Sequence, residues 1–243
     1  MRRIDVLTLI AIAIVAYALS NVIHEGLGHG LACVAVGGKP VELSSLHFSC
    51  ESEHSKFVSS AGCIANVIAA AIGLALFRRK RSYFLWLFTT LNLLMPAGYL
   101  LFSGVMRVGD WVNVCRDLSP AIWRPALAII GAVLYFVAAK FSAKLLQPLV
   151  ADRASARRLT LIPYFTGGIL YCVSGLFNPV GPILIAISAA AASFGGASGL
   201  IWLIEFIHPY GEGVTIERSF AWHAAATVAA VIFIGVLGPA IRF

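Results

Sequence analysis

The sequence predicts an all-α, polytopic membrane protein of six or seven transmembrane helices, with a short β-like hairpin after the first helix. Of its 243 residues, 60% are hydrophobic and only 12% are charged, which is about half the charge of a soluble domain. The mean hydropathy is +0.89, and a spanning helix takes about 20 residues. These values exclude a soluble globular enzyme and an intrinsically disordered chain.

The first apolar run extends from Ile4 to about Val36. At 1.5 Å per residue it is about 50 Å long, so we expect an uncleaved span that tilts, kinks or ends in a cavity. The polar interval 37–56 follows, and its weak alternation predicts a hairpin. The remaining spans are expected at Phe57–Phe77, Tyr83–Val105, Ala121–Leu146, two helices within Leu159–Ile207 separated at Asn178–Pro182, and Phe220–Ile241.

The formal net charge of +7 indicates Lys and Arg in cytoplasmic loops, because no basic stretch is interleaved with exposed aromatic residues. The lipid bilayer is therefore an expected partner and nucleic acid is not. The cysteines are odd in number and form no Cys-x-x-Cys pair, so we predict packing roles and no disulfide framework. They are Cys33, Cys50, Cys63, Cys115 and Cys172.

Three ionisable residues lie inside the first apolar run: His24, Glu25 and His29. Such residues are costly within a membrane and are candidates for function. Imidazole nitrogens and carboxylate oxygens are zinc ligands, and a nearby glutamate can accept a proton from a zinc-bound water. The cluster therefore predicts a zinc site.

The spacing His-Glu-x-x-x-His is one residue longer than that of the zinc helix motif His-Glu-x-x-His. Residues five apart point about 140° away from each other on a regular α-helix, so His24 and His29 would not face one metal. A π-bulge would restore the geometry, and Gly26, Gly28 and Gly30 make such a distortion plausible. Alternatively, Glu25 pairs with His29 at a spacing of four and is itself a ligand.

The chain resembles the site-2 protease family of intramembrane zinc metalloproteases over about residues 1–120. Besides His24-Glu25 and His29, the resemblance rests on the interval 37–56 and on the small-residue segment 59–66, which ends in Asn66. It also includes the segment 92–96, from Asn92 to Pro96, and Asp110. Asp110 stands farther from Pro96 than expected and lacks the usual Leu-Asp-Gly context.

The resemblance implies that His24, His29 and Asp110 hold Zn²⁺ and that Glu25 is the catalytic base. Asn66 and Asn92 are the residues expected to bind substrate, which would be a membrane segment of another protein. Residues 1–120 then form the metalloprotease-like core. Residues 121–243 add further transmembrane helices to the same membrane domain. We expect a multi-pass protein of a prokaryotic plasma or inner membrane.

The topology predicts that the candidate residues lie on one membrane face. His24 and His29 lie near the far end of the first span, Asn66 near the start of the second, and Asp110 just after the third. With the N-terminus inside, the inner segments hold 12 of the 18 cations, which makes the site face extracytoplasmic.

Two other classes of function remain open. A non-catalytic member of the same fold would bind a membrane partner or a metal without cleavage. A transporter would also suit the broken spans and a carboxylate such as Glu205. A second group, His47, Cys50 and His54, has metal-like spacing, but we expect it to lie in a solvated loop.

Overall fold

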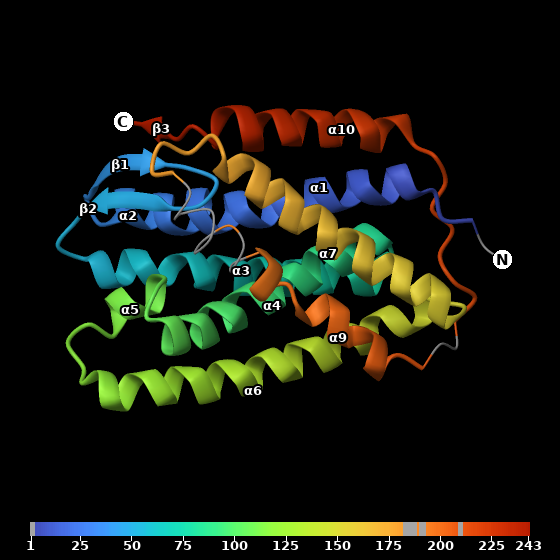
Figure 1. Ribbon diagram of the computed structural model, residues 1–243, viewed down its shortest axis with the longest axis horizontal. Coiled ribbons are helices and arrows are strands. Elements are labelled where there is room, and N and C mark those ends of the chain that lie inside the picture. Colours follow the sequence, from blue (N-terminus) through green and yellow to red (C-terminus); the bar gives the residue numbers. More distant parts are fainter. Residues whose placement is uncertain (1–2, 182–188, 190–192, 209–210) are drawn as a thin grey trace.

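A computed structural model describes residues 3–181, 189, 193–208 and 211–243. Long helices lie side by side, and a small sheet covers one end of the bundle (Figure 1). The helices are α1 (Val6–Val22), α2 (Leu31–Ala35), α3 (Ser55–Arg79), α4 (Tyr83–Met106), α5 (Asp110–Val114), α6 (Pro120–Leu146), α7 (Arg153–Gly175), α9 (Gly199–Phe206) and α10 (Phe220–Ala230). Two π-helical segments, Ile23–Gly30 and Val231–Val236, and a 3-10 turn, Gln147–Leu149, extend or join them.

Four helical runs are long and apolar enough to cross a membrane. They are Val6–Ala35, Ser55–Arg79, Tyr83–Met106 and Pro120–Leu149, and they match the first four predicted spans. Within the described residues the predicted total of six or seven is not confirmed: α7 has 23 residues but is less apolar, and the helical runs Ser193–Phe206 and Phe220–Val236 are shorter. The predicted break at Asn178–Pro182 follows the end of α7, but Pro182 lies outside the described part of the chain.

The predicted hairpin is present and gains a third strand. Strands β1 (Lys39–Leu43) and β2 (Phe48–Glu51) pair antiparallel, and β3 (Ile241–Arg242) pairs with β1, giving the order β2-β1-β3. The final predicted span, to Ile241, is therefore too long. Helix ends by Val236, because the Gly-Pro pair that follows it interrupts the backbone hydrogen bonds.

Apolar side chains are distributed as a bilayer requires. The interior holds large buried apolar side chains, among them Trp86, which is fully buried and whose indole N–H donates to the Ser142 carbonyl oxygen at 2.9 Å. The outer faces of α3 and α6 expose large aliphatic residues. Among them are Ile64, Val67, Ile68, Ile72, Ile129, Ile130 and Val133.

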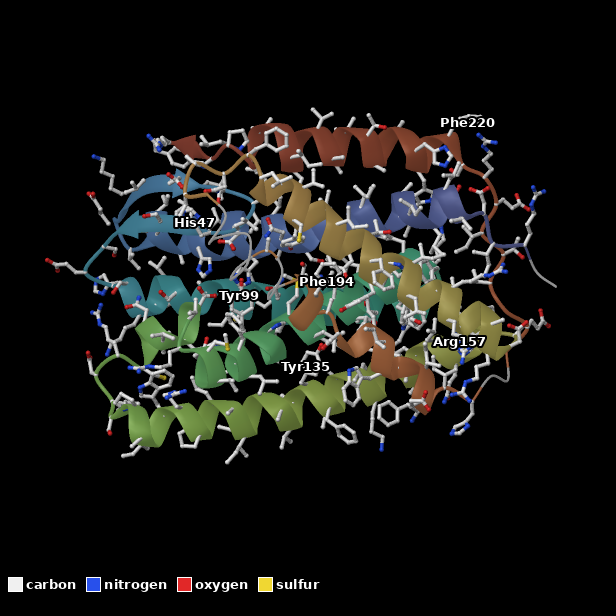
Figure 2. The ribbon with its side chains drawn as sticks, in the orientation of Figure 1. His47, Tyr99, Tyr135, Arg157, Phe194 and Phe220 are labelled. Atoms are coloured by element: carbon white, nitrogen blue, oxygen red, sulfur yellow. A yellow bond between two sulfur atoms is a disulfide. The ribbon has the colours of Figure 1, made fainter. Side chains whose placement is uncertain are left out.

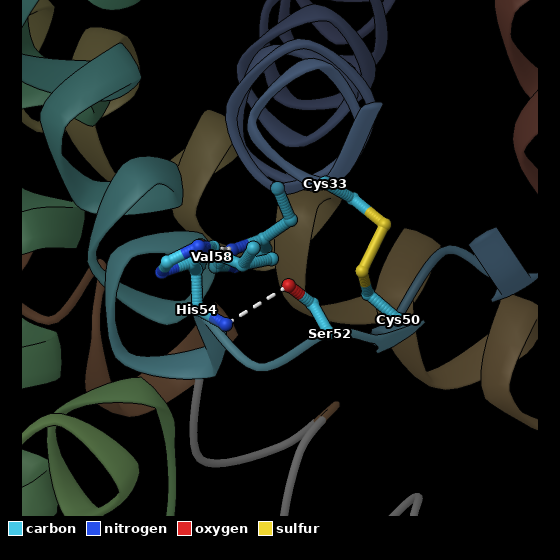
Figure 3. The surroundings of a disulfide bond; sticks show 6 residues. Cys33, Cys50, Ser52, His54 and Val58 are labelled. Carbon is cyan, nitrogen blue, oxygen red and sulfur yellow. Dashed lines mark hydrogen bonds between the residues drawn. A yellow bond between two sulfur atoms is a disulfide. The ribbon is translucent and has the colours of Figure 1, made fainter. Parts of the chain in front are cut away.

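Cys33 and Cys50 form a disulfide (Figure 3). The prediction that these two cysteines only pack was wrong. The bond joins α2 to the edge strand β2, and the two cysteines are 17 residues apart in the sequence. The two sulfurs meet because the hairpin folds back over the end of the first helical run. No local sequence pattern predicts that the chain folds back there. Cys63, Cys115 and Cys172 are free thiols.

Candidate metal centre

The first helix changes to π-helical geometry over Ile23–Gly30. A π-helix bonds residue i to i+5, so it accommodates one extra residue in a turn. His24 and His29 consequently lie on the same side, with their rings 4.8 Å apart at 89°. Of the two alternatives that the spacing allows, the structure has the π-helical distortion, and the two imidazoles converge where a regular α-helix would separate them.

Three donor atoms meet at this point. His24 Nε2 and His29 Nε2 are 3.2 Å apart, and Asp110 Oδ2 lies 3.2 Å from the first and 3.5 Å from the second. Zinc bonds to nitrogen and oxygen are about 2.0–2.2 Å long. Donors of one tetrahedral ion are therefore expected about 3–4 Å apart, and the three distances fit.

The opposite ring nitrogens explain why both Nε2 atoms face the cluster. Nδ1 of His24 lies 2.6 Å from Asn66 Oδ1, and Nδ1 of His29 lies 2.7 Å from the Val58 carbonyl oxygen. Both neighbours are acceptors, so each Nδ1 carries the proton and donates it. Each Nε2 is then left with a free lone pair, which is the tautomer that a metal ligand requires.

A chain of buried amides fixes the orientation of His24. The Asn92 Nδ2 donates to the Phe88 carbonyl oxygen at 2.8 Å, which turns Asn92 Oδ1 toward Asn66. The Asn66 Nδ2 donates to that oxygen at 2.7 Å, which turns Asn66 Oδ1 toward His24. Both asparagines are fully buried and neither lines the cavity at the site. This geometry favours positioning of His24 over the predicted contact with substrate.

Asp110 reaches the histidines as the first residue of the short helix α5. Gly109 precedes it with φ +99°, a conformation that glycine adopts at little cost. One turn later, Asn113 Nδ2 donates to Ser59 Oγ at 2.7 Å and to the Ser55 carbonyl oxygen at 3.2 Å. These bonds tie α5 to α3. Asn113 was missed in the sequence, because its partners lie more than fifty residues away.

Helix α3 approaches the histidines through a glycine. A Cβ atom at Gly62 would lie 2.5 Å from His29 Nε2 and 2.8 Å from His24 Cε1. Gly28 faces Gly62 from the first helical run, and a Cβ atom at Gly28 would lie 2.6 Å from the Gly62 Cα. Both positions must therefore lack a side chain for α3 to pack against the site.

The carboxyl group of Asp110 is ionised at neutral pH. Its side chain is 20% exposed, and burial alone would raise its pKa. When the imidazoles of His24 and His29 carry a proton on both nitrogens, their hydrogen bonds and positive charge outweigh burial and hold the pKa of Asp110 well below its ordinary value. Asp110 is thus available as an anionic ligand.

A cavity of about 720 Å³ opens beside the donor cluster. Glu25, His29 and Asp110 line it, together with strand β2 and the end of α4. Glu25 is 4% exposed and is not part of the converging donor set found among the described residues. It is free to act on a molecule in the cavity, which favours the catalytic-base interpretation over the alternative in which Glu25 is a ligand.

Aromatic rings enclose the two imidazoles. The Tyr99 ring stacks on His24 with a centroid distance of 4.7 Å, and Phe48 of β2 stacks on His29 at 6.4 Å. Figure 2 shows Tyr99 on α4 and His47 at the sheet, both near this end of the bundle. The sequence offered no signal for either stack, because each joins separate elements.

His47, Cys50 and His54, the group with metal-like spacing, do not converge in the structure. Cys50 is in the disulfide, and His54 lies in a separate surface hollow. His47 instead lines the main cavity, with its Nε2 3.0 Å from Glu42 Oε1 and its Nδ1 3.0 Å from Ser44 Oγ.

Glu205 pairs with Arg153 at 3.2 Å on the surface. Both side chains are exposed, so Glu205 is not the buried carboxylate that a transport pathway needs.

Comparisons with protein-family models, with curated proteins and with solved structures found no match. The interpretation of the site therefore depends on its own geometry.

Proposed function

We propose that this protein is an intramembrane zinc metalloprotease that resembles the site-2 proteases. One observation carries the proposal: two imidazole nitrogens from one π-helical segment and a carboxylate oxygen from α5 lie within 4.8 Å of one another, beside Glu25 and a cavity. Three protein ligands with a fourth position open are typical of catalytic zinc. The sequence departs from the family pattern in two places. The π-helical turn takes up the extra residue between His24 and His29, and the turn at Gly109 directs Asp110 to the histidines.

The donor set fits Zn²⁺, with His24, His29 and Asp110 as ligands. When bound, the ion would lower the pKa of a coordinated water to about 7 and polarise a peptide carbonyl. Glu25 then accepts a proton from the attacking water and delivers it to the leaving amine nitrogen, so that its carboxylate is regenerated.

We further propose that the substrate is an extended segment of another membrane protein. Peptide bonds within a helix are shielded, so the segment must unwind locally before it is cut. Strand β2 is an edge strand in the order β2-β1-β3, and its residues Phe48, Ser49 and Cys50 line the cavity. Pairing with that edge would hold an unwound segment by its backbone.

The test compares Glu25→Gln with the exposed control Glu53→Gln. Cleavage of a library of fluorogenic transmembrane peptides in detergent micelles is measured alongside zinc content. We expect Glu25→Gln to keep the metal and to lose about 10²–10⁴-fold in rate, whereas Glu53→Gln keeps the wild-type rate. Wild-type rates in Glu25→Gln would contradict the role of Glu25 as the base, and zinc-loaded protein that cleaves nothing would support a non-catalytic binding protein instead.

A further inference from the structure

The disulfide lies at the same end of the molecule as the metal centre. Cys33 follows His29 by four residues in one continuous helical run, and Cys50 lies on β2 and lines the cavity. Phe48, which stacks on His29, is two residues before Cys50. Disulfides persist in oxidising compartments and are rare where thiols are kept reduced. The wall of this cavity therefore belongs to an oxidising environment.

The distribution of charge gives the same orientation independently. Figure 2 shows Arg157 at the end of the bundle opposite His47. Among the described residues, that opposite end holds eleven cations. They are Arg3, Arg78, Arg79, Lys80, Arg81, Lys140, Lys144, Arg153, Arg157, Arg158 and Arg218.

The site end holds six described cations: Lys39, Lys56, Arg107, Arg116, Arg124 and Arg242. Half of them pair with carboxylates. Lys56 and Arg116 contact Asp117, and Arg242 contacts Glu42. Segments rich in Lys and Arg stay in the cytoplasm, so the end opposite the site is the cytoplasmic one.

We propose that the cavity opens to the oxidising, non-cytosolic side of the membrane. If the protein is the protease proposed above, its substrates are membrane proteins whose scissile bond lies in the non-cytosolic half of their span. The loops bordering the cavity, including Val108, Gly109 and Asn113, all lie at this end. A substrate segment would thus enter from that side, and the part beyond the cut would be released there.

Labelling of two matched single cysteines tests the orientation without any need for activity. The background carries Cys63→Ala, Cys115→Ser and Cys172→Ala. Ser119→Cys and Ala151→Cys then place one exposed thiol just before and one just after α6, with no change of charge. Labelling in denaturant shows that each thiol can react with the reagent, a membrane-impermeant maleimide.

We expect Ser119→Cys to be labelled in intact cells and Ala151→Cys only after permeabilisation. The reverse pattern, or equal labelling of both positions, would overturn the proposal. Alkylation of Cys33 and Cys50 in cells should require prior reduction, and free thiols there would contradict an oxidising environment. Absence of cleavage would refute the proposed function but leave this orientation intact. A cut mapped to the cytosolic half of a substrate span would refute the substrate class.

Discussion

At the scale of single residues, metal binding at the candidate centre would depend on which ring nitrogen of each histidine already takes part in a hydrogen bond. Asn66 Oδ1 accepts a hydrogen bond from His24 Nδ1, with the two atoms 2.6 Å apart, and Asn66 in turn donates to Asn92. We predict that Asn66→Ala lowers zinc affinity by about 10–100-fold, the usual cost of losing such a partner. Asn66→Asp keeps an oxygen at this position and should retain most of the affinity. Zinc competition with a chromophoric chelator measures both, and equal affinities in wild type and Asn66→Ala would contradict the role.

Close packing at Gly62 gives a second prediction at this scale. Gly62→Ala would place a methyl group 2.5 Å from His29 Nε2, so the imidazoles must move apart and zinc binding should fall by at least about 10-fold. Gly26→Ala is the control, because its methyl group would meet nothing nearer than Val22 Cγ1 at 3.8 Å. The measurement is the zinc content of the two purified variants, which should be lower in Gly62→Ala than in Gly26→Ala. Equal loading would show that α3 does not constrain the histidines.

The residues that converge at the candidate site were largely predictable from the sequence, but their geometry was not. The types and order of His24, Glu25 and His29 indicate a metal site directly. Their spacing permits two pairings, and only the path of the backbone over Ile23–Gly30 chooses between them. The roles of Asn66 and Asn92 could not be assigned from the sequence. An asparagine buried behind the site and one that faces a substrate look the same in the sequence.

At the scale of elements, α5 carries Asp110 and is held to α3 by Asn113. We predict that Asn113→Ala and Ser59→Ala each weaken zinc binding, because both remove the same 2.7 Å hydrogen bond. The double variant should be no worse than the more affected single one. Ser60→Ala is the matched control, since its hydroxyl donates only within its own helix, to the Phe57 carbonyl oxygen. Additive losses in a zinc titration would mean that the two residues act separately.

The disulfide secures the hairpin against the end of the first helical run. Closing a loop of this size stabilises a fold by about 3 kcal/mol, so reduction should lower the thermal unfolding midpoint of the purified protein. The double variant Cys33→Ala/Cys50→Ala should unfold at the lower temperature and be insensitive to reductant. An unchanged wild-type midpoint after verified reduction would show that the sheet is held by other contacts.

Elements formed by local patterns were predictable from the sequence, and those formed by distant partners were not. Alternation in 37–56 predicts the hairpin, because both strands are adjacent in the chain. Strand β3 finds its partner β1 about two hundred residues earlier, and no periodicity marks two residues as a strand. The same holds for the pairing of Cys33 with Cys50.

At the scale of the whole molecule, the convergence of the site follows from the direction of the spans. The first and third long helices run the same way, so His29 and Asp110 end on one side, as the sequence predicts. The number of spans was less predictable. Apolar runs after residue 159 form α7, α9 and α10, which are too short or too charged to match the first four.

Zinc stoichiometry of the purified protein tests the central claim most directly. The account predicts about one Zn²⁺ per chain in the wild type, bound by His24, His29 and Asp110, and retention of this metal in His54→Ala. It predicts loss of the metal in His29→Ala and in Asp110→Ala. Wild-type protein without zinc after purification in zinc-containing buffer, or full loading of both ligand variants, would contradict it.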